Sequence, residues 1–141
     1  MSFPFHVGDT LPPLERGPIG AEQLARYAQI SGDFNPIHLD EKAAIEAGLE
    51  GIIAHGMLSM AYLGSMITRA IADVGELVDL TVRFRGMVKL GDLVTCEGTV
   101  TNLIDAPEGK VATIAVLVKT NHRDVAIKGT ASVRVKEEVA S

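Results

Sequence analysis

The fold of this chain depends first on Gly56-Met-Leu-Ser-Met-Ala-Tyr-Leu-Gly-Ser-Met-Ile-Thr-Arg-Ala-Ile-Ala72, an apolar run whose only charged residue is Arg69. On a helical projection its apolar side chains point in nearly every direction, and a helix of this kind has to be enclosed by other structure. Small residues in the run would let a sheet approach closely. They are Gly56, Ser59, Ala61, Gly64 and Ser65. We therefore expect a central, enclosed helix over residues 56–72.

The second half of the chain alternates apolar and polar residues, which is typical of strands with one buried face. The alternating stretches are residues 80–84, 94–101, 114–118 and 125–135, with turn signals at 107–109 and 121–124. Short connections between sequential strands predict an antiparallel sheet. Its apolar face needs a cover, and only the 56–72 helix is apolar enough to provide it. The sequence thus predicts an α+β protein with an antiparallel β-sheet wrapped around a long central helix.

Three short elements are predicted before this run: a strand over residues 14–16, a helix over 21–31 and a helix over 41–47. Gly32 follows the first helix, and Asp40 and Gly48 flank the second. These are the residue types that favour helix ends. The N-terminal third is therefore expected to add small elements to the same single domain, which spans residues 1–141.

Polar side chains are concentrated between the two short helices, in Ser31-Gly-Asp-Phe-Asn-Pro-Ile-His38. Residues 32–39 are expected not to be helical, because Pro36 fixes its own φ and favours an extended Asn35. A straight chain would separate Asp33 from His38 by roughly 17 Å. The loop must bend back if both are to act on one small molecule, and it contains the residue types that allow this.

Composition limits the classes of function. The formal net charge of −5 argues against nucleic-acid binding and against an anionic membrane surface, which both need basic protein surfaces. The apolar run is too short and interrupted to span a bilayer, and the N-terminus does not resemble a signal peptide. The single cysteine, Cys96, excludes an internal disulfide and suits a cytoplasmic protein.

Two segments carry a resemblance to a known family. Tyr27-Ala-Gln-Ile-Ser-Gly-Asp-Phe-Asn-Pro-Ile-His38 resembles the hydratase-2 signature of the MaoC-like dehydratases, the (R)-specific enoyl-CoA hydratases. Ala54-His-Gly-Met57 resembles the entry to that family's central helix. The likeness runs from the first helix to the last strand. It implies one hotdog domain that acts as a homodimer or a dimer of dimers.

The resemblance implies a catalytic role for Asp33, His38 and Gly56. Hydration of a 2-enoyl thioester needs a base for the attacking water, and the ordinary pKa of a histidine, about 6.5, suits that task. Asp33 would orient the same water. The Gly56 N–H, at the positive end of the helix, would stabilise the thioester oxygen. No metal or redox cofactor is needed, and the substrate is an acyl-CoA or acyl-carrier-protein thioester.

Other residues have two interpretations each. Asn35 is expected to hold the loop or the substrate carbonyl side, and His55 to cap the helix, pack beside the loop or contact substrate. Met57 and Leu58 are candidates for the acyl channel, and Ser59 for the pocket wall or for helix packing. Arg83, Arg85 and Lys89 either meet ligand phosphates or form a solvated strand face. Asp33, Asp40, His38 and His55 include metal-ligand types, but no metal-binding spacing supports that alternative.

Competing functions also remain open. They are an acyl-carrier-protein dehydratase, a non-catalytic hotdog partner or acyl-binding module, and a thioesterase. A thioesterase would be expected to carry a carboxylate on the buried helix, and residues 56–72 contain none.

Overall fold

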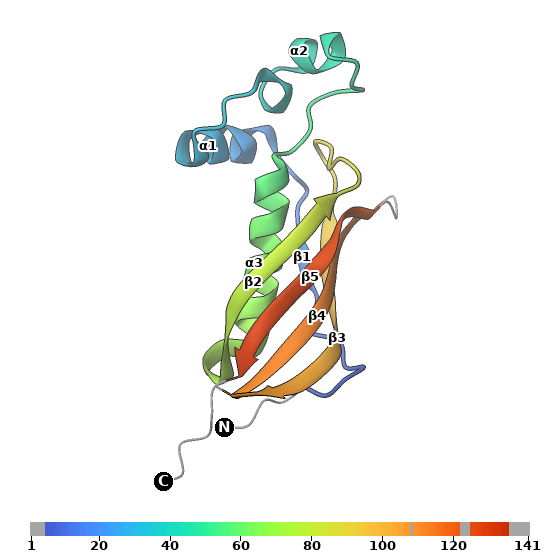
Figure 1. Cartoon of the computed structure of the whole chain (residues 1–141). Helices are drawn as coiled ribbons and strands as arrows, with labels where there is room; N and C mark the ends of the chain where they lie inside the picture. Colours follow the sequence, from blue (N-terminus) through green and yellow to red (C-terminus); the bar gives the residue numbers. More distant parts are fainter. Residues whose placement is uncertain (1–4, 108, 122–124, 136–141) are drawn as a thin grey trace.

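The computed structural model describes residues 5–107, 109–121 and 125–135. Its core is one five-stranded sheet in the order β1-β3-β4-β5-β2, in which every neighbouring pair is antiparallel. The strands are β1 (Leu14–Arg16), β2 (Gly75–Phe84), β3 (Val94–Ala106), β4 (Gly109–Thr120) and β5 (Val125–Val135). The sheet curves around the central helix α3, as Figure 1 shows. The predicted antiparallel sheet around one helix, the hotdog architecture, is confirmed.

Helix α3 (Gly56–Ile71) lies along the concave face of the sheet. Its buried residues include Leu63, Met66 and Ile67, which belong to one apolar cluster with the inward side chains of the strands. A Cβ at Gly98 of β3 would lie 3.2 Å from the Met66 methyl group. The close approach between helix and sheet therefore depends on a small residue in the strand as well as on those in the helix.

The sheet covers only one side of α3, which corrects the expectation that the whole helix is enclosed. Met57, Ala61, Ser65 and Thr68 are exposed in the single chain, along with Arg69. They recur every three or four residues, so they form one stripe. The apolar composition of the run is therefore not explained by the packing of this chain alone.

The elements at the N-terminal end of α3 follow the prediction with one correction. Helices α1 (Ala21–Ser31) and α2 (Glu41–Glu46) form as expected, with Gly32 left-handed after α1 and the Asp40 side chain accepting from the Lys42 N–H. Residues 36–38, predicted as non-helical, instead form the short 3₁₀ helix η1 (Pro36–His38). Pro36 stands in its first turn, where a missing N–H costs nothing, and the Asn35 side chain caps it.

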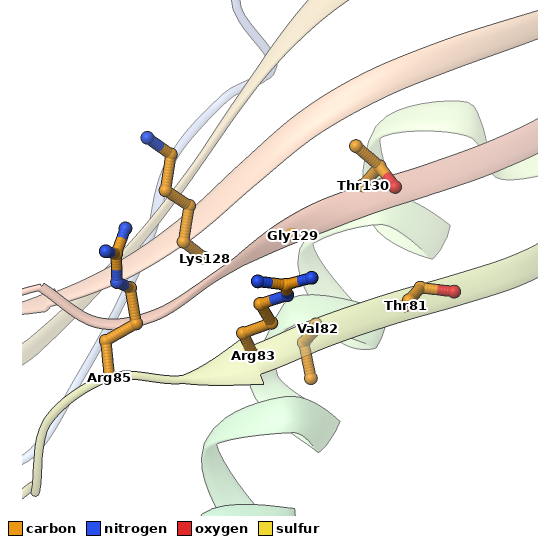
Figure 2. A pocket seen from close by; sticks show the side chains of 7 residues that line it. All are labelled: Thr81, Val82, Arg83, Arg85, Lys128, Gly129 and Thr130. Atoms are coloured by element: carbon orange, nitrogen blue, oxygen red, sulfur yellow. The ribbon is translucent and has the colours of Figure 1, made fainter.

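The two predicted turns fall between consecutive strands of the sheet in sequence, and the strand register sets which residues lie opposite one another. β3 and β4 pair as far as Ala106 and Gly109, at the turn predicted for 107–109, of which residue 108 lies outside the described part of the chain. Of the turn predicted at 121–124, residues 122–124 lie outside the described part of the chain. In the register of β5 with the edge strand β2, Arg83 lies opposite Lys128 (Figure 2). None of the helices in the described residues could span a membrane.

Candidate active site

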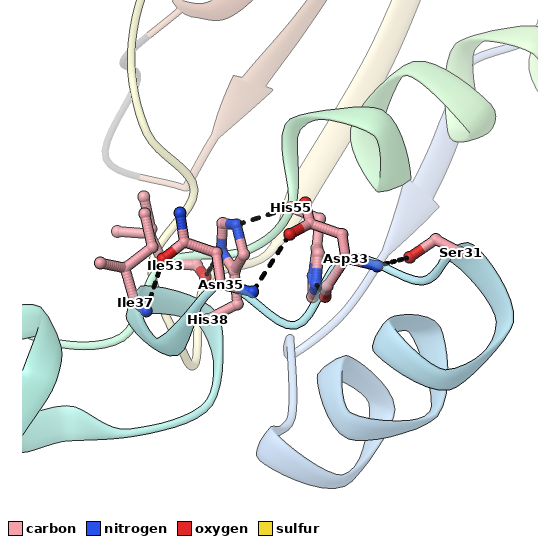
Figure 3. A network of polar contacts seen from close by, with 7 residues as sticks. All are labelled: Ser31, Asp33, Asn35, Ile37, His38, Ile53 and His55. Carbon is pink, nitrogen blue, oxygen red and sulfur yellow. Dashed lines mark hydrogen bonds and ion pairs between the residues drawn. The ribbon is translucent and has the colours of Figure 1, made fainter.

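The segment between α1 and η1 is held in a bend by successive contacts from side chains to the main chain (Figure 3). The Asp33 N–H donates to Ser31 Oγ, and the Asn35 N–H donates to Asp33 Oδ1, each at 3.2 Å. The Ile37 N–H then donates to Asn35 Oδ1, also at 3.2 Å. Short polar side chains favour such turns because they replace the hydrogen bonds of regular structure. The predicted bend is confirmed, and Asn35 serves the loop.

The bend brings Asp33 and His38 together at a partly open surface. His38 Nε2 lies 3.8 Å from Asp33 Oδ2, and the two side chains are 9% and 50% exposed. His38 Nδ1 lies 2.8 Å from the carbonyl oxygen of Ile53. A carbonyl only accepts, so Nδ1 carries a proton, and Nε2 is the ring nitrogen that faces the carboxylate. The separation is too long for a direct hydrogen bond and suits one oxygen atom bridging both groups.

His55, the residue before α3, is the second imidazole of the site and is only 1% exposed. Its Nε2 lies 3.0 Å from the main-chain carbonyl oxygen of Asp33, to which it donates. Its ring stacks on His38, with centroids 4.0 Å apart, and forms a T-shaped contact with the Tyr27 ring, with centroids 4.9 Å apart. Nδ1 is buried with no hydrogen-bond partner in the described chain. His55 thus packs beside the loop, one of its predicted roles, and fixes the position of Asp33.

The N-terminus of α3 begins at Gly56, whose N–H is among the first of the helix and has no partner within it. A Cβ at this position would lie 2.8 Å from the Phe84 ring, which occupies the adjacent space. The expectation that glycine leaves room here for the thioester is therefore incomplete, because β2 also requires the small residue.

The other residues predicted to contact substrate differ in their exposure and in their partners. Met57 is 57% exposed on the open stripe of α3, whereas Leu58 and Ser59 are buried. Leu58 belongs to the apolar cluster of the core. Lys89, a candidate for ligand phosphates, instead pairs with Glu50, its Nζ 2.7 Å from Oε2, and this hydrogen bond lowers the pKa of Glu50.

Three partners of the site were not predicted from sequence: the Ile53 carbonyl, the ring of Phe84 and the ring of Tyr27. A main-chain carbonyl leaves no signature in the residue type, so nothing identified Ile53. Tyr27 opens the quoted motif, and its position on the apolar face of α1 was the available signal.

The same residues include metal-ligand types. One candidate ligand atom each from Asp33, His38 and His55 can be chosen within 4.8 Å of one another. His38 Nδ1 and His55 Nε2 already contact main-chain carbonyls, which leaves one nitrogen on each ring. That the site works without a metal remains a prediction.

A curved antiparallel sheet around one helix, with an acid and an imidazole beside the helix N-terminus, defines a hotdog protein with a candidate proton-transfer site. Residues 6–126 match the family model described as a MaoC like domain. The chain is 32% identical over 117 residues to the (R)-specific enoyl-CoA hydratase of Aeromonas caviae, covering 82% of this chain and 86% of that protein. It therefore belongs to the MaoC-like family.

Two further comparisons agree. The 3-hydroxybutyryl-CoA dehydratase of Methylorubrum extorquens is 32% identical over 123 residues, covering 85% of this chain and 76% of that protein. The solved structure of an (R)-hydratase from A. caviae involved in PHA biosynthesis superposes with a TM-score of 0.84 at 29% identity, covering 94% of this chain and 98% of that one. The protein is an enzyme of the hydro-lyase class, which adds or removes water.

Proposed function

We propose that the protein is an (R)-specific 2-enoyl-CoA hydratase that also dehydrates (3R)-hydroxyacyl-CoA. The observation that carries this proposal is the pair of His38 Nε2 and Asp33 Oδ2, 3.8 Å apart, with the His38 proton fixed on Nδ1 by Ile53. A water held between the two groups would meet one acceptor to orient it and one base to deprotonate it. Neither group would need to rearrange before the reaction.

The proposed reaction conserves every atom of water. The water oxygen bonds to C3 of the enoyl thioester as His38 Nε2 takes one of its protons. Electrons of the C2–C3 double bond move toward the thioester carbonyl, which becomes an enolate. The imidazolium then returns the proton to C2 on the same face, which gives syn addition. The reverse sequence eliminates water from the (3R)-hydroxyacyl thioester.

The enolate oxygen needs a donor, and we assign it to the N–H of Gly56. The first N–H groups of a helix are unpaired and lie at the positive end of the helix dipole. Loss of one preorganised donor of this kind typically costs on the order of 3 kcal/mol of transition-state stabilisation. Because the protein itself supplies the base, the orienting carboxylate and the donor to the enolate oxygen, the proposal requires no metal or redox cofactor.

Coenzyme A is the proposed carrier, because the relatives that cover 82% and 85% of this chain are named as CoA enzymes. An acyl-carrier-protein dehydratase is the alternative within the same chemistry. A non-catalytic partner subunit would not need the ordered pair of Asp33 and His38. We place the enzyme in the cytoplasm, since its single cysteine fits a reducing compartment.

A second copy of the chain is proposed to cover the open stripe of α3. Met57, Ala61 and Ser65 are exposed on a helix whose composition suits an enclosed position. Small residues let two surfaces approach closely, and symmetric dimers are the commonest oligomers. Such a dimer would also close the site beside the helix N-terminus against water.

The test uses purified protein alone with crotonyl-CoA, following loss of the enoyl absorbance and the chirality of the product. We expect the (3R)-hydroxy product, and kcat to fall by two to four orders of magnitude in Asp33→Asn and in His38→Asn. Asparagine at position 38 keeps a donor for Ile53 while removing the base. Retained turnover in a folded variant would remove that residue from the chemistry, and an (S) product would refute the proposed stereochemistry.

A further inference from the structure

Basic side chains gather in a hollow on the outer face of the sheet, opposite the face that α3 covers (Figure 2). The hollow has a volume of about 310 Å³. Its polar lining comes from Thr81, Arg83 and Arg85 at the end of β2 and from Lys128 and Thr130 of β5. Neither the site described above nor the packing of the core uses these residues.

The strand register builds this hollow. Thr81 lies opposite Thr130 and Arg83 opposite Lys128, so these side chains share one face of the sheet. Gly129 lies between the two pairs, and a Cβ there would lie 2.1 Å from the Thr81 carbonyl oxygen. The position therefore excludes a side chain, and Gly129 and Val82 line the hollow between the two polar pairs.

Among the described residues, no carboxylate balances the positive charges of the hollow. Like charges directly opposite each other destabilise a strand pair, and Arg85 adds a third cation to Arg83 and Lys128. Across residues 5–107, 109–121 and 125–135, no ion pair joins any of these three to a carboxylate. Asp79, on the same strand, accepts the Thr81 hydroxyl and is not part of the lining. In a chain of net charge −5, such a cluster favours an anionic ligand.

The position of the hollow connects it to the candidate active site. Phe84 stands between Arg83 and Arg85 in sequence, and its ring packs against Gly56 at the N-terminus of α3. The hollow and the site thus lie at the same end of β2, on opposite faces of the sheet. β2 is an edge strand, so among the described residues no strand lies beyond it. An extended pantetheine arm, comparable to about five residues of extended chain, spans roughly 17 Å and would pass around the end of the strand.

We propose that Arg83, Arg85 and Lys128 bind the phosphate groups at the nucleotide end of a coenzyme A thioester while its acyl end reaches Asp33 and His38. Guanidinium groups bind phosphate through paired hydrogen bonds, and an ammonium adds a point charge. A hollow of this size fits phosphate groups, whereas a carrier protein would spread its contacts over about 800 Å². The inference rests on the proposed function, since it assigns a binding site to the coenzyme A end of the substrate proposed there.

The test compares crotonyl thioesters of coenzyme A, of 3′-dephospho-coenzyme A and of pantetheine. The double variant Arg83→Gln/Lys128→Gln should lower kcat/KM for crotonyl-CoA at least about tenfold. The advantage of the CoA thioester over the pantetheine thioester, expected in the unaltered protein, should disappear in the variant. Lys42→Gln/Lys110→Gln removes the same charge elsewhere and should retain that advantage.

A binding measurement separates this inference from the proposed function. Adenosine 3′,5′-bisphosphate should bind the unaltered protein in calorimetry and bind the Arg83/Lys128 variant at least about tenfold more weakly. If all three thioesters are inert but the nucleotide binds as stated, the proposed function fails and the phosphate site stands. Equal losses for CoA and pantetheine thioesters, unchanged nucleotide binding, or a defect confined to a crotonyl carrier protein would each overturn the inference.

Discussion

Replacing His55 by phenylalanine separates the positioning of the active site from the stability of the fold. Phenylalanine keeps a flat ring that can stack on His38 and pack against Tyr27, but it cannot donate to the Asp33 carbonyl. The buried Nδ1 atom, which has no partner in the described chain, also disappears. The variant thus removes the hydrogen bond of Nε2 and the unpartnered Nδ1 atom together.

The expected change in the free energy of unfolding is small. Losing the hydrogen bond from Nε2 costs about 1 kcal/mol, and the Asp33 carbonyl beside a half-exposed side chain can turn to water. Removing a buried polar atom without a partner restores about 1–3 kcal/mol. The two effects oppose each other, so the urea midpoint of His55→Phe should lie close to that of the unaltered protein.

Activity should respond differently, because His55 holds the main chain of Asp33, the residue that we propose orients the water. A misplacement of about 1 Å at a reacting group can cost on the order of 100-fold in rate. We expect kcat of His55→Phe to fall by about 10- to 100-fold with little change in KM. His55→Gln, whose amide can donate from near the position of Nε2, should recover part of the loss.

Steady-state kinetics with crotonyl-CoA and urea unfolding of the same preparations provide the assay. His6→Gln is the control, since His6 is exposed beside Asp9 in a segment that pairs with β3. Unchanged kcat in a folded His55→Phe enzyme would refute the positioning role. A loss of several kcal/mol in stability would refute the argument from the unpartnered nitrogen.

Four further outcomes are expected. Gly56→Ala should lower activity by displacing the Phe84 ring, and added Phe84→Ala should relieve the defect; a persistent defect would assign the glycine to substrate instead. Ala61→Glu should convert a dimer to monomers in sedimentation, while an unchanged dimer would exclude the stripe on α3 as its interface. Burial raises the pKa of the Cys96 thiol from 9.0 to about 11, despite the charge of Arg16. The contribution of the neutral thiol to the free energy of unfolding is therefore complete below pH 9.0 and is lost as the pH rises toward 11. Urea unfolding should show this loss, and Cys96→Ala should lack it. Exhaustive dialysis against a chelator should leave hydration intact, and activity restored only by added zinc would indicate a metal at Asp33, His38 and His55.

The sequence was sufficient for the elements whose residues repeat with a regular period. Alternation in the second half predicted the strands, and a glycine or a capping aspartate marked the ends of α1 and α2. The open stripe of α3 was not predictable in the same way. Periodicity shows that residues are apolar, but it does not show whether the covering surface belongs to the same chain. The 3₁₀ turn at Pro36–His38 depends on a side-chain cap that the proline rule alone does not include.

The candidate site was predictable as a set of residues, but not as a network. The pairing of Asp33 with His38 came from the family resemblance, and the residue types of the segment allowed the bend that the pairing needs. The contact between His55 and Asp33 joins residues 22 apart and uses a main-chain oxygen, so it has no signature in residue type. The approach of Phe84 to Gly56 depends on the register of β2 with β5, which sequence alone leaves undetermined.

Main-chain carbonyls orient both imidazoles, and this links the chemistry to the path of the chain. His38 donates to Ile53, whose own N–H donates to the Ile37 carbonyl, while His55 donates to Asp33. The polar loop is therefore joined on both sides to the residues that lead directly into α3. The proposed base His38, the carboxylate of Asp33 and the N-terminus of α3 should consequently move together. Substituting the Asp33 side chain leaves its main-chain carbonyl in place for His55. Asp33→Asn therefore tests the carboxylate while the hydrogen bond from His55 to that carbonyl is kept. Conversely, His55→Phe removes this hydrogen bond while the Asp33 carboxylate is kept.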